Sequence, residues 1–118
     1  MQTSEIIEIG ELVPDFENEG VLVLFGETAP AELKDMSVIH RPKNNTQEGI
    51  QKGGSLTISG TQYKIQEVGS LANKNFDELG HISIYFGDNE SQEVLPGAIL
   101  VTPNIFPNMK IGDTITFE

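Results

Sequence analysis

The feature that most constrains this chain is a succession of short apolar runs, each closed by a glycine, a proline or a polar turn. Few segments show the spacing of an amphipathic helix, whereas short alternating or continuous apolar runs are typical of β-strands. The runs occupy residues 6–9, 21–25, 36–40, 56–60, 63–68, 81–86, 98–101 and 114–117. About seven to eight short strands at this spacing predict an all-β fold, either a small barrel or a sandwich.

The same pattern predicts which way individual residues face, because successive side chains of a strand point to opposite sides. In the run at 81–86, Ile82, Ile84 and Phe86 share one face, and His81 lies on the other. Residues 21–25 are apolar throughout and are predicted to be buried on both faces. The length of 118 residues, without an internal repeat or a low-complexity tract, fits one ordinary domain.

One or two short helices are expected between the strands. Thr28 is placed to cap a turn that begins near Pro30. A second helix is predicted to begin with Ser70 as its cap and to end at Gly80, as helices that end in a left-handed glycine do. This second helix is expected to pack inward through its large apolar residues, Leu71, Phe76 and Leu79.

Composition excludes several classes of function. Seven Lys and Arg against eighteen Asp and Glu leave a net charge of −11, which disfavours nucleic acids and anionic membrane surfaces as partners. Cysteine is absent, which removes disulfides, thiolate nucleophiles and cysteine-based metal sites. No apolar run approaches the roughly 20 residues of a membrane span, and the first residues lack the pattern of a secretory signal. We therefore expect a cytoplasmic protein without direct membrane insertion.

Few residues are candidates for chemistry. The chain has neither a Gly-x-Ser-x-Gly elbow nor a P-loop, and its two histidines are His40 and His81. Taken alone, either histidine would more often be a structural residue at the end of a strand. Their separation in the sequence gives little support to a metal site, and we expect neither a metal nor a cofactor. Arg41 and Lys43 follow His40 closely, and Lys43 opens a polar, glycine-rich stretch at residues 43–54.

Longer motifs surround both histidines. They are Ala29-Pro30-Ala31 within residues 25–33, followed by Val38-Ile39-His40; Leu79-Gly80-His81 within residues 68–82; and the closing stretches 95–97 and 110–114. Together they resemble the glucitol/sorbitol-specific enzyme IIA component of the bacterial phosphoenolpyruvate-dependent sugar phosphotransferase system. The resemblance covers essentially the whole chain.

The resemblance implies a single IIA phosphotransfer domain over residues 1–118, a phosphoryl carrier of the protein-N(pi)-phosphohistidine–sugar phosphotransferase system. It places the phosphorylated histidine at His40. The implied donor is the histidine-containing phosphocarrier protein, and the implied acceptor is the IIB portion of a membrane permease with IIB and IIC components. His81 matches the family's Leu-Gly-His motif, and we infer a supporting role for it.

An imidazole suits such a relay, because its unperturbed pKa of about 6.5 leaves it largely neutral and nucleophilic near pH 7. One ring nitrogen attacks phosphorus while a hydrogen-bond acceptor holds the N–H of the other. Charge on the transferred group must also be stabilised. The candidate donors for this are His81, Arg41, Lys43 and the backbone N–H groups of the glycine-rich stretch.

Two other interpretations stay open from the sequence. The chain could be a non-catalytic β-barrel interaction or regulatory module of the same ancestry, or the two histidines could form a metal site. The sequence also leaves open which sugar alcohol the system serves. A homodimer is a further alternative, in which an edge strand such as that at residues 21–25 pairs between two copies.

Overall fold

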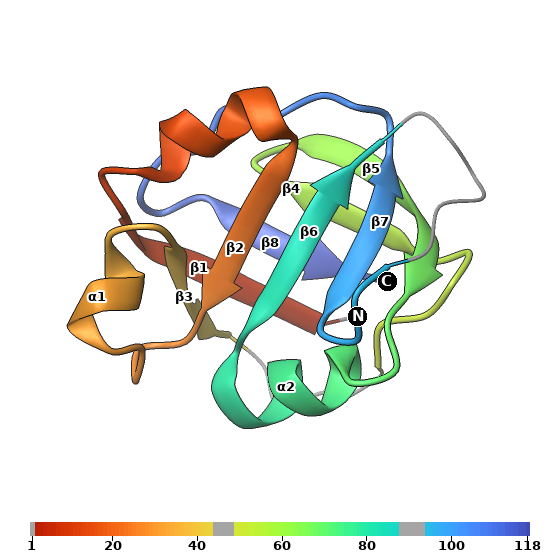
Figure 1. The fold of residues 1–118 in the computed structure, drawn as a ribbon, viewed down its shortest axis with the longest axis horizontal. Helices are drawn as coiled ribbons and strands as arrows, with labels where there is room; N and C mark the ends of the chain where they lie inside the picture. The colour runs from red at the N-terminus through yellow and green to blue at the C-terminus, as the bar shows by residue number, and fades with distance from the viewer. Residues whose placement is uncertain (1, 44–48, 88–93) are drawn as a thin grey trace.

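Eight strands form a closed barrel in the computed structural model, which describes residues 2–43, 49–87 and 94–118 (Figure 1). The strands are β1 (Gln2–Ile9), β2 (Val21–Phe25), β3 (Val38–Pro42), β4 (Ser55–Ile58), β5 (Thr61–Val68), β6 (Ile82–Phe86), β7 (Ala98–Thr102) and β8 (Thr114–Phe117). Their order around the barrel is β1-β3-β2-β6-β7-β5-β4-β8. The predicted all-β class is confirmed, and of the two architectures the barrel is the one that forms.

Strand β2 lies inside the barrel wall and is not an edge. It pairs with β3 in parallel and with β6 antiparallel, and β6 in turn pairs with β7 in parallel. Pairing of residues 21–25 between two copies is therefore not available, because closure of a barrel leaves no free strand edge. The expected burial of β2 on both faces holds only at Phe25, since Val21 and Val23 on the outer face are half-buried.

Three short helices connect the strands within the described residues: η1 (Val13–Glu19), α1 (Ala31–Lys34) and α2 (Ala72–Leu79). The sequence reading did not predict η1, whose first turn contains a proline. The two expected side-chain caps are wrong, because α1 begins after Pro30 and α2 after Leu71, and neither start has a side-chain capping bond. The expected glycine end of α2 is confirmed, since Gly80 is left-handed with φ of 66°.

Helix α2 lies across one end of the barrel, below β2, β6 and β7 in Figure 1. Ala72 and Phe76 are buried at 0% and 7% exposure, but Leu71 and Leu79 are 46% and 43% exposed. The expectation that all three large apolar residues pack inward is therefore wrong for both leucines. Residues four apart share one side of a helix, so α2 turns Ala72 and Phe76 toward the core, while Leu71 before the helix and Leu79 at its end lie outside.

Two apolar clusters define the inside and the outside of the barrel wall. The interior cluster includes Ile6, Val38 and Ile82, all at 0% exposure, together with Phe76 of α2. A small outer cluster joins Phe25, Ala29 and Ile39, with Ile7 and Leu33 packed against it. The parity of a strand residue relative to these clusters therefore tells which side of the wall its side chain occupies.

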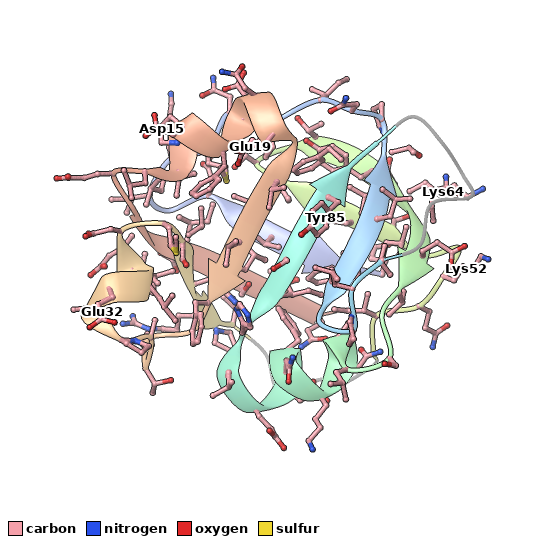
Figure 2. All side chains as sticks on the ribbon, viewed as in Figure 1. Asp15, Glu19, Glu32, Lys52, Lys64 and Tyr85 are labelled. Carbon is pink, nitrogen blue, oxygen red and sulfur yellow. The ribbon has the colours of Figure 1, made fainter. Side chains whose placement is uncertain are left out.

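Charged side chains are distributed unevenly over the surface. In Figure 2, Asp15 and Glu19 lie on η1 and Glu32 on α1, whereas Lys52 and Lys64 lie at the opposite side of the view, near β5. Lys52 also forms an ion pair with Glu67 at 2.9 Å. Among the described residues, no helix is long and apolar enough to cross a membrane.

Candidate functional site

His40 lies on β3 with its side chain directed into the barrel. It has the same parity as the interior residue Val38 and faces Ile6 of β1 across the strand pair. Only 1% of its surface is exposed. Such complete burial of a histidine requires that its polar atoms find partners, because an unpaired buried polar group is costly.

Both ring nitrogens of His40 have hydrogen-bond partners. Nδ1 lies 2.9 Å from the hydroxyl oxygen of Ser4, and Nε2 lies 2.7 Å from the backbone carbonyl oxygen of Gly80. A carbonyl can only accept, so Nε2 carries the proton, and in the neutral ring Nδ1 accepts a hydrogen bond from the Ser4 hydroxyl. Burial lowers the pKa of His40, and the Gly80 carbonyl only partly opposes this effect. Burial therefore favours the neutral form of the ring.

Ser4 reaches the ring through the register of the sheet. It lies two residues before Ile6 on the same face of β1, so it is the diagonal neighbour of His40. Ser4 is itself 5% exposed, and its strand also pairs with β8 on the other side. The hydroxyl is thus held in the barrel wall at a fixed distance from Nδ1.

Helix α2 supplies the other two contacts of the ring. Phe76 stacks on His40 with ring centroids 5.4 Å apart and an interplanar angle of 11°, and it meets Phe117 edge-on. The turn at Gly80 is held by a bond from the Gly26 N–H to the Leu79 carbonyl at 2.9 Å. A Cβ at Gly80 would lie 2.9 Å from the Gly26 nitrogen and 3.2 Å from Nε2 of His40, so this approach requires a glycine.

A pocket of about 650 Å³ opens beside His40. It is lined by the start of β1, the end of β3, the loop after β2 and the last turn of α2, and both His40 and Gly80 contribute to it. Three carboxylates line it, those of Glu27, Asp77 and Glu78, and none of its lining residues is lysine or arginine. His40 therefore lines a pocket whose charged lining residues are all acidic, although one of them, Glu27, is paired with Arg41.

His81 lies on the opposite side of the wall from His40. Its ring packs on Phe25 of the outer cluster at a centroid distance of 4.6 Å, and its Nδ1 is 3.3 Å from the Leu24 carbonyl. It does not line the pocket. The two histidines are linked through the backbone, because the carbonyl that holds His40 belongs to Gly80, the residue before His81.

The basic residues that follow His40 are paired with carboxylates and do not line the pocket. Arg41 forms two hydrogen bonds with the Glu27 carboxylate, at 2.8 and 3.0 Å, and lowers the pKa of that carboxyl below its ordinary value. Lys43 lies 3.9 Å from Glu5. Both side chains are half exposed or more. Part of the glycine-rich stretch at 43–54, residues 44–48, lies outside the described residues.

Comparison with known proteins identifies the family. The family model for "PTS system glucitol/sorbitol-specific IIA component" matches residues 1–116. The chain belongs to this family. Curated IIA components from Shigella flexneri and Escherichia coli (strain K12) are each 30% identical over 114 residues, which is 96% of this chain and 90% of the relative. A crystal structure of a PTS system IIA component from Enterococcus faecalis V583 matches with a TM-score of 0.89 and 33% identity, covering 98% of both chains.

Membership in this IIA family is consistent with a phosphoryl carrier that works with other components of the phosphotransferase system. Of the two histidines, His40 is the one that lines the pocket. Within the described residues, no group of three or more His, Asp or Glu side chains is arranged to hold a metal ion.

Three contacts of the His40 ring were missed by sequence reasoning: the Ser4 hydroxyl, the Phe76 ring and the Gly80 carbonyl. Ser4 shares the parity of Ile6, which gave a usable signal once β1 was recognised as a strand. The pairing of β1 with β3, however, joins strands that are far apart in the sequence, and no local pattern specifies it. Gly80 was identified only as the end of a helix, and its carbonyl carries no sequence signature.

Proposed function

We propose that this chain is a phosphohistidine carrier in which His40 accepts a phosphoryl group from the histidine-containing phosphocarrier protein. It then passes the group to the IIB portion of a glucitol/sorbitol permease, in the cytoplasm, where sugar uptake is coupled to sugar phosphorylation. The observation that carries this proposal is that the His40 ring lines a pocket and that burial favours its neutral form. The chain's membership in a family of IIA components supports it.

The acidic residues that line the pocket favour a protein over a small molecule as the phosphoryl donor. Asp77 and Glu78 disfavour free phosphate esters, whereas a basic face on the phosphocarrier protein would be attracted and would bring positive charge to the transferred group. Since Arg41 is engaged by Glu27, we assign stabilisation of the transition state first to the partner. We assign His81 an indirect role: it follows Gly80 in the chain and helps to position the Gly80 carbonyl that holds His40.

Transfer requires a change at the ring, because both nitrogens are engaged and the ring is 1% exposed. The enclosed ring also favours a second candidate function, a regulatory or interaction module in which His40 is purely structural. The two functions differ in whether His40 ever forms a bond to phosphorus.

The deciding experiment incubates the protein with phosphoenolpyruvate, enzyme I and the phosphocarrier protein. The relay predicts phosphate that is labile in acid and stable in alkali, bound to wild-type protein and absent from His40→Ala. Normal labelling of His40→Ala would reject the site. A wild-type protein without label, whose binding to partners is unaffected by His40→Ala, would favour the interaction module.

A further inference from the structure

The two hydrogen-bond partners of His40 differ in how firmly they are held. Ser4 is 5% exposed and lies in a strand paired on both sides, with β3 and with β8. Gly80 follows the last turn of α2, where Asp77, Glu78 and Leu79 are exposed and line the pocket. The bond to Nε2 therefore belongs to a surface turn, and the bond to Nδ1 belongs to the barrel wall.

The two partners also differ in chemistry. A carbonyl oxygen only accepts, so Gly80 can hold Nε2 only while that nitrogen carries a proton. A hydroxyl both donates and accepts, so Ser4 can hold Nδ1 in either neutral tautomer. It donates to the bare Nδ1 of the resting ring and would accept from Nδ1–H after the tautomer changes.

We propose that Ser4 is a positioning residue for phosphoryl transfer at His40, retaining Nδ1 while the turn at Gly80 releases Nε2 to the pocket. This inference rests on the proposed relay function. Ser4 lines the pocket as Gly80 does, but release of Nδ1 by Ser4 would require the phosphoryl group to displace a side chain that is only 5% exposed and lies in a strand paired on both sides.

When the turn moves, the Nε2 proton passes to water, and Nδ1 takes a proton from water and donates it in a hydrogen bond to Ser4. The lone pair on Nε2 then bonds to phosphorus as the phosphorus–nitrogen bond of the donor phosphohistidine breaks, and that electron pair returns to the donor imidazole. Return of the phosphoryl group to an acceptor reverses the same changes at His40.

Three variants test the role of the hydroxyl. Ser4→Ala removes it, and we expect the rate of phosphoryl transfer to fall about tenfold, since one hydrogen bond to the ring is lost. Ser4→Thr keeps a hydroxyl and should restore the rate to within about threefold of wild type. Ser37→Ala is the matched control, because Ser37 is also buried but its hydroxyl has no hydrogen-bond partner among the described residues, and its rate should stay within about twofold.

Nuclear magnetic resonance of the phosphorylated wild-type protein, labelled with ¹⁵N at histidine, gives a readout independent of how well the variants fold. The phosphoryl group is expected on Nε2, with a slowly exchanging proton on Nδ1. A phosphoryl group on Nδ1, or a folded Ser4→Ala protein that reacts at the wild-type rate, would overturn the inference and leave the relay intact. Absence of any phosphate on wild-type His40 would instead overturn the relay itself.

Discussion

The two histidines offer a direct comparison between the inside and the outside of one barrel wall. His40 is enclosed, with a partner on each nitrogen and Phe76 stacked on its face. His81 packs against Phe25 on the outer side, and its hydrogen bond to the Leu24 carbonyl is longer, at 3.3 Å. The same side chain thus has two environments, separated by strand parity. His40 is therefore distinguished from His81 by the pocket it lines, and not by being a histidine.

Replacing His40 gives the largest expected effect. His40→Gln keeps a polar side chain of similar reach, but an amide cannot form the labile bond to phosphorus. We expect labelling from phosphoenolpyruvate to fall by at least about a hundredfold, while the circular dichroism spectrum of the barrel is retained. His81→Gln, measured in parallel, should keep most of its label. An equal loss of labelling in both variants would show that the inner and outer histidines do not differ in function.

Replacing Gly80 tests the backbone link between the two sides. Gly80→Ala adds a side chain at φ of 66° and brings Cβ within 2.9 Å of the Gly26 nitrogen. We expect the free energy of unfolding to fall by about 2 kcal/mol or more. Gly60→Ala is the control, because its φ is 88° but nothing lies within 4 Å of the added Cβ, and it should lose only about 1 kcal/mol. Equal losses would show that the close approach at Gly80 is not important.

The enclosure of His40 also predicts a pH dependence of stability. Burial lowers the pKa of His40 in the folded state, so the unfolded chain binds a proton first as the pH falls. The contribution of His40 to the free energy of unfolding is fully present above the pKa of about 6.5 that the ring has in the unfolded chain. It is lost as the pH falls from there through the lower pKa of the folded state. Urea unfolding between pH 5 and 7.5 should show a smaller decline for His40→Gln than for wild type. Parallel curves would indicate that the ring is not held neutral.

The all-β fold was largely predictable because most of its strands show a local pattern of alternating or continuous apolar residues. Ile82, Ile84 and Phe86 alternate as expected, and all three are buried. The left-handed Gly80 was likewise recognisable from its place after a helix. What failed was capping: Thr28 and Ser70 fit the preferences for helix starts, but the chain enters each helix with another residue at that position.

The candidate site was only half predictable. His40 was singled out by resemblance to a family, and its parity with Val38 places it inside once β3 is known. The contact with Ser4 depends on which strands pair, and the stacking of Phe76 depends on where α2 crosses the barrel end. Both follow from long-range packing, which single-sequence patterns do not encode. The same limit explains why sequence alone did not show that Arg41 and Lys43, close to His40 in sequence, pair with Glu27 and Glu5 and do not line the pocket.

Replacing His81 is expected to have a moderate effect. His81→Gln should still be labelled but more slowly, by about two- to fivefold, because the outer ring steadies the segment that carries the Gly80 carbonyl. Rapid-quench measurement of phosphoryl gain and loss tests this expectation. Unchanged rates in both directions would remove any supporting role for His81. His81→Phe, which keeps the packing on Phe25 but not the hydrogen bond, would separate the two contributions of the ring.

The smallest expected effect belongs to Arg41, the neighbour of His40 on the exposed face of β3. Its ion pair with Glu27 is solvent-exposed, and such pairs contribute about 0–1 kcal/mol. Arg41→Gln should therefore change the free energy of unfolding by less than about 1 kcal/mol and the labelling rate by less than about twofold. Lys52→Gln, which breaks the comparable pair with Glu67 on another part of the surface, is the matched control. A tenfold loss of labelling confined to Arg41→Gln would mean that the guanidinium leaves Glu27 for the phosphoryl group during transfer. The outer face of β3 would then take part in the chemistry, and the separation between the two sides of the wall would no longer hold.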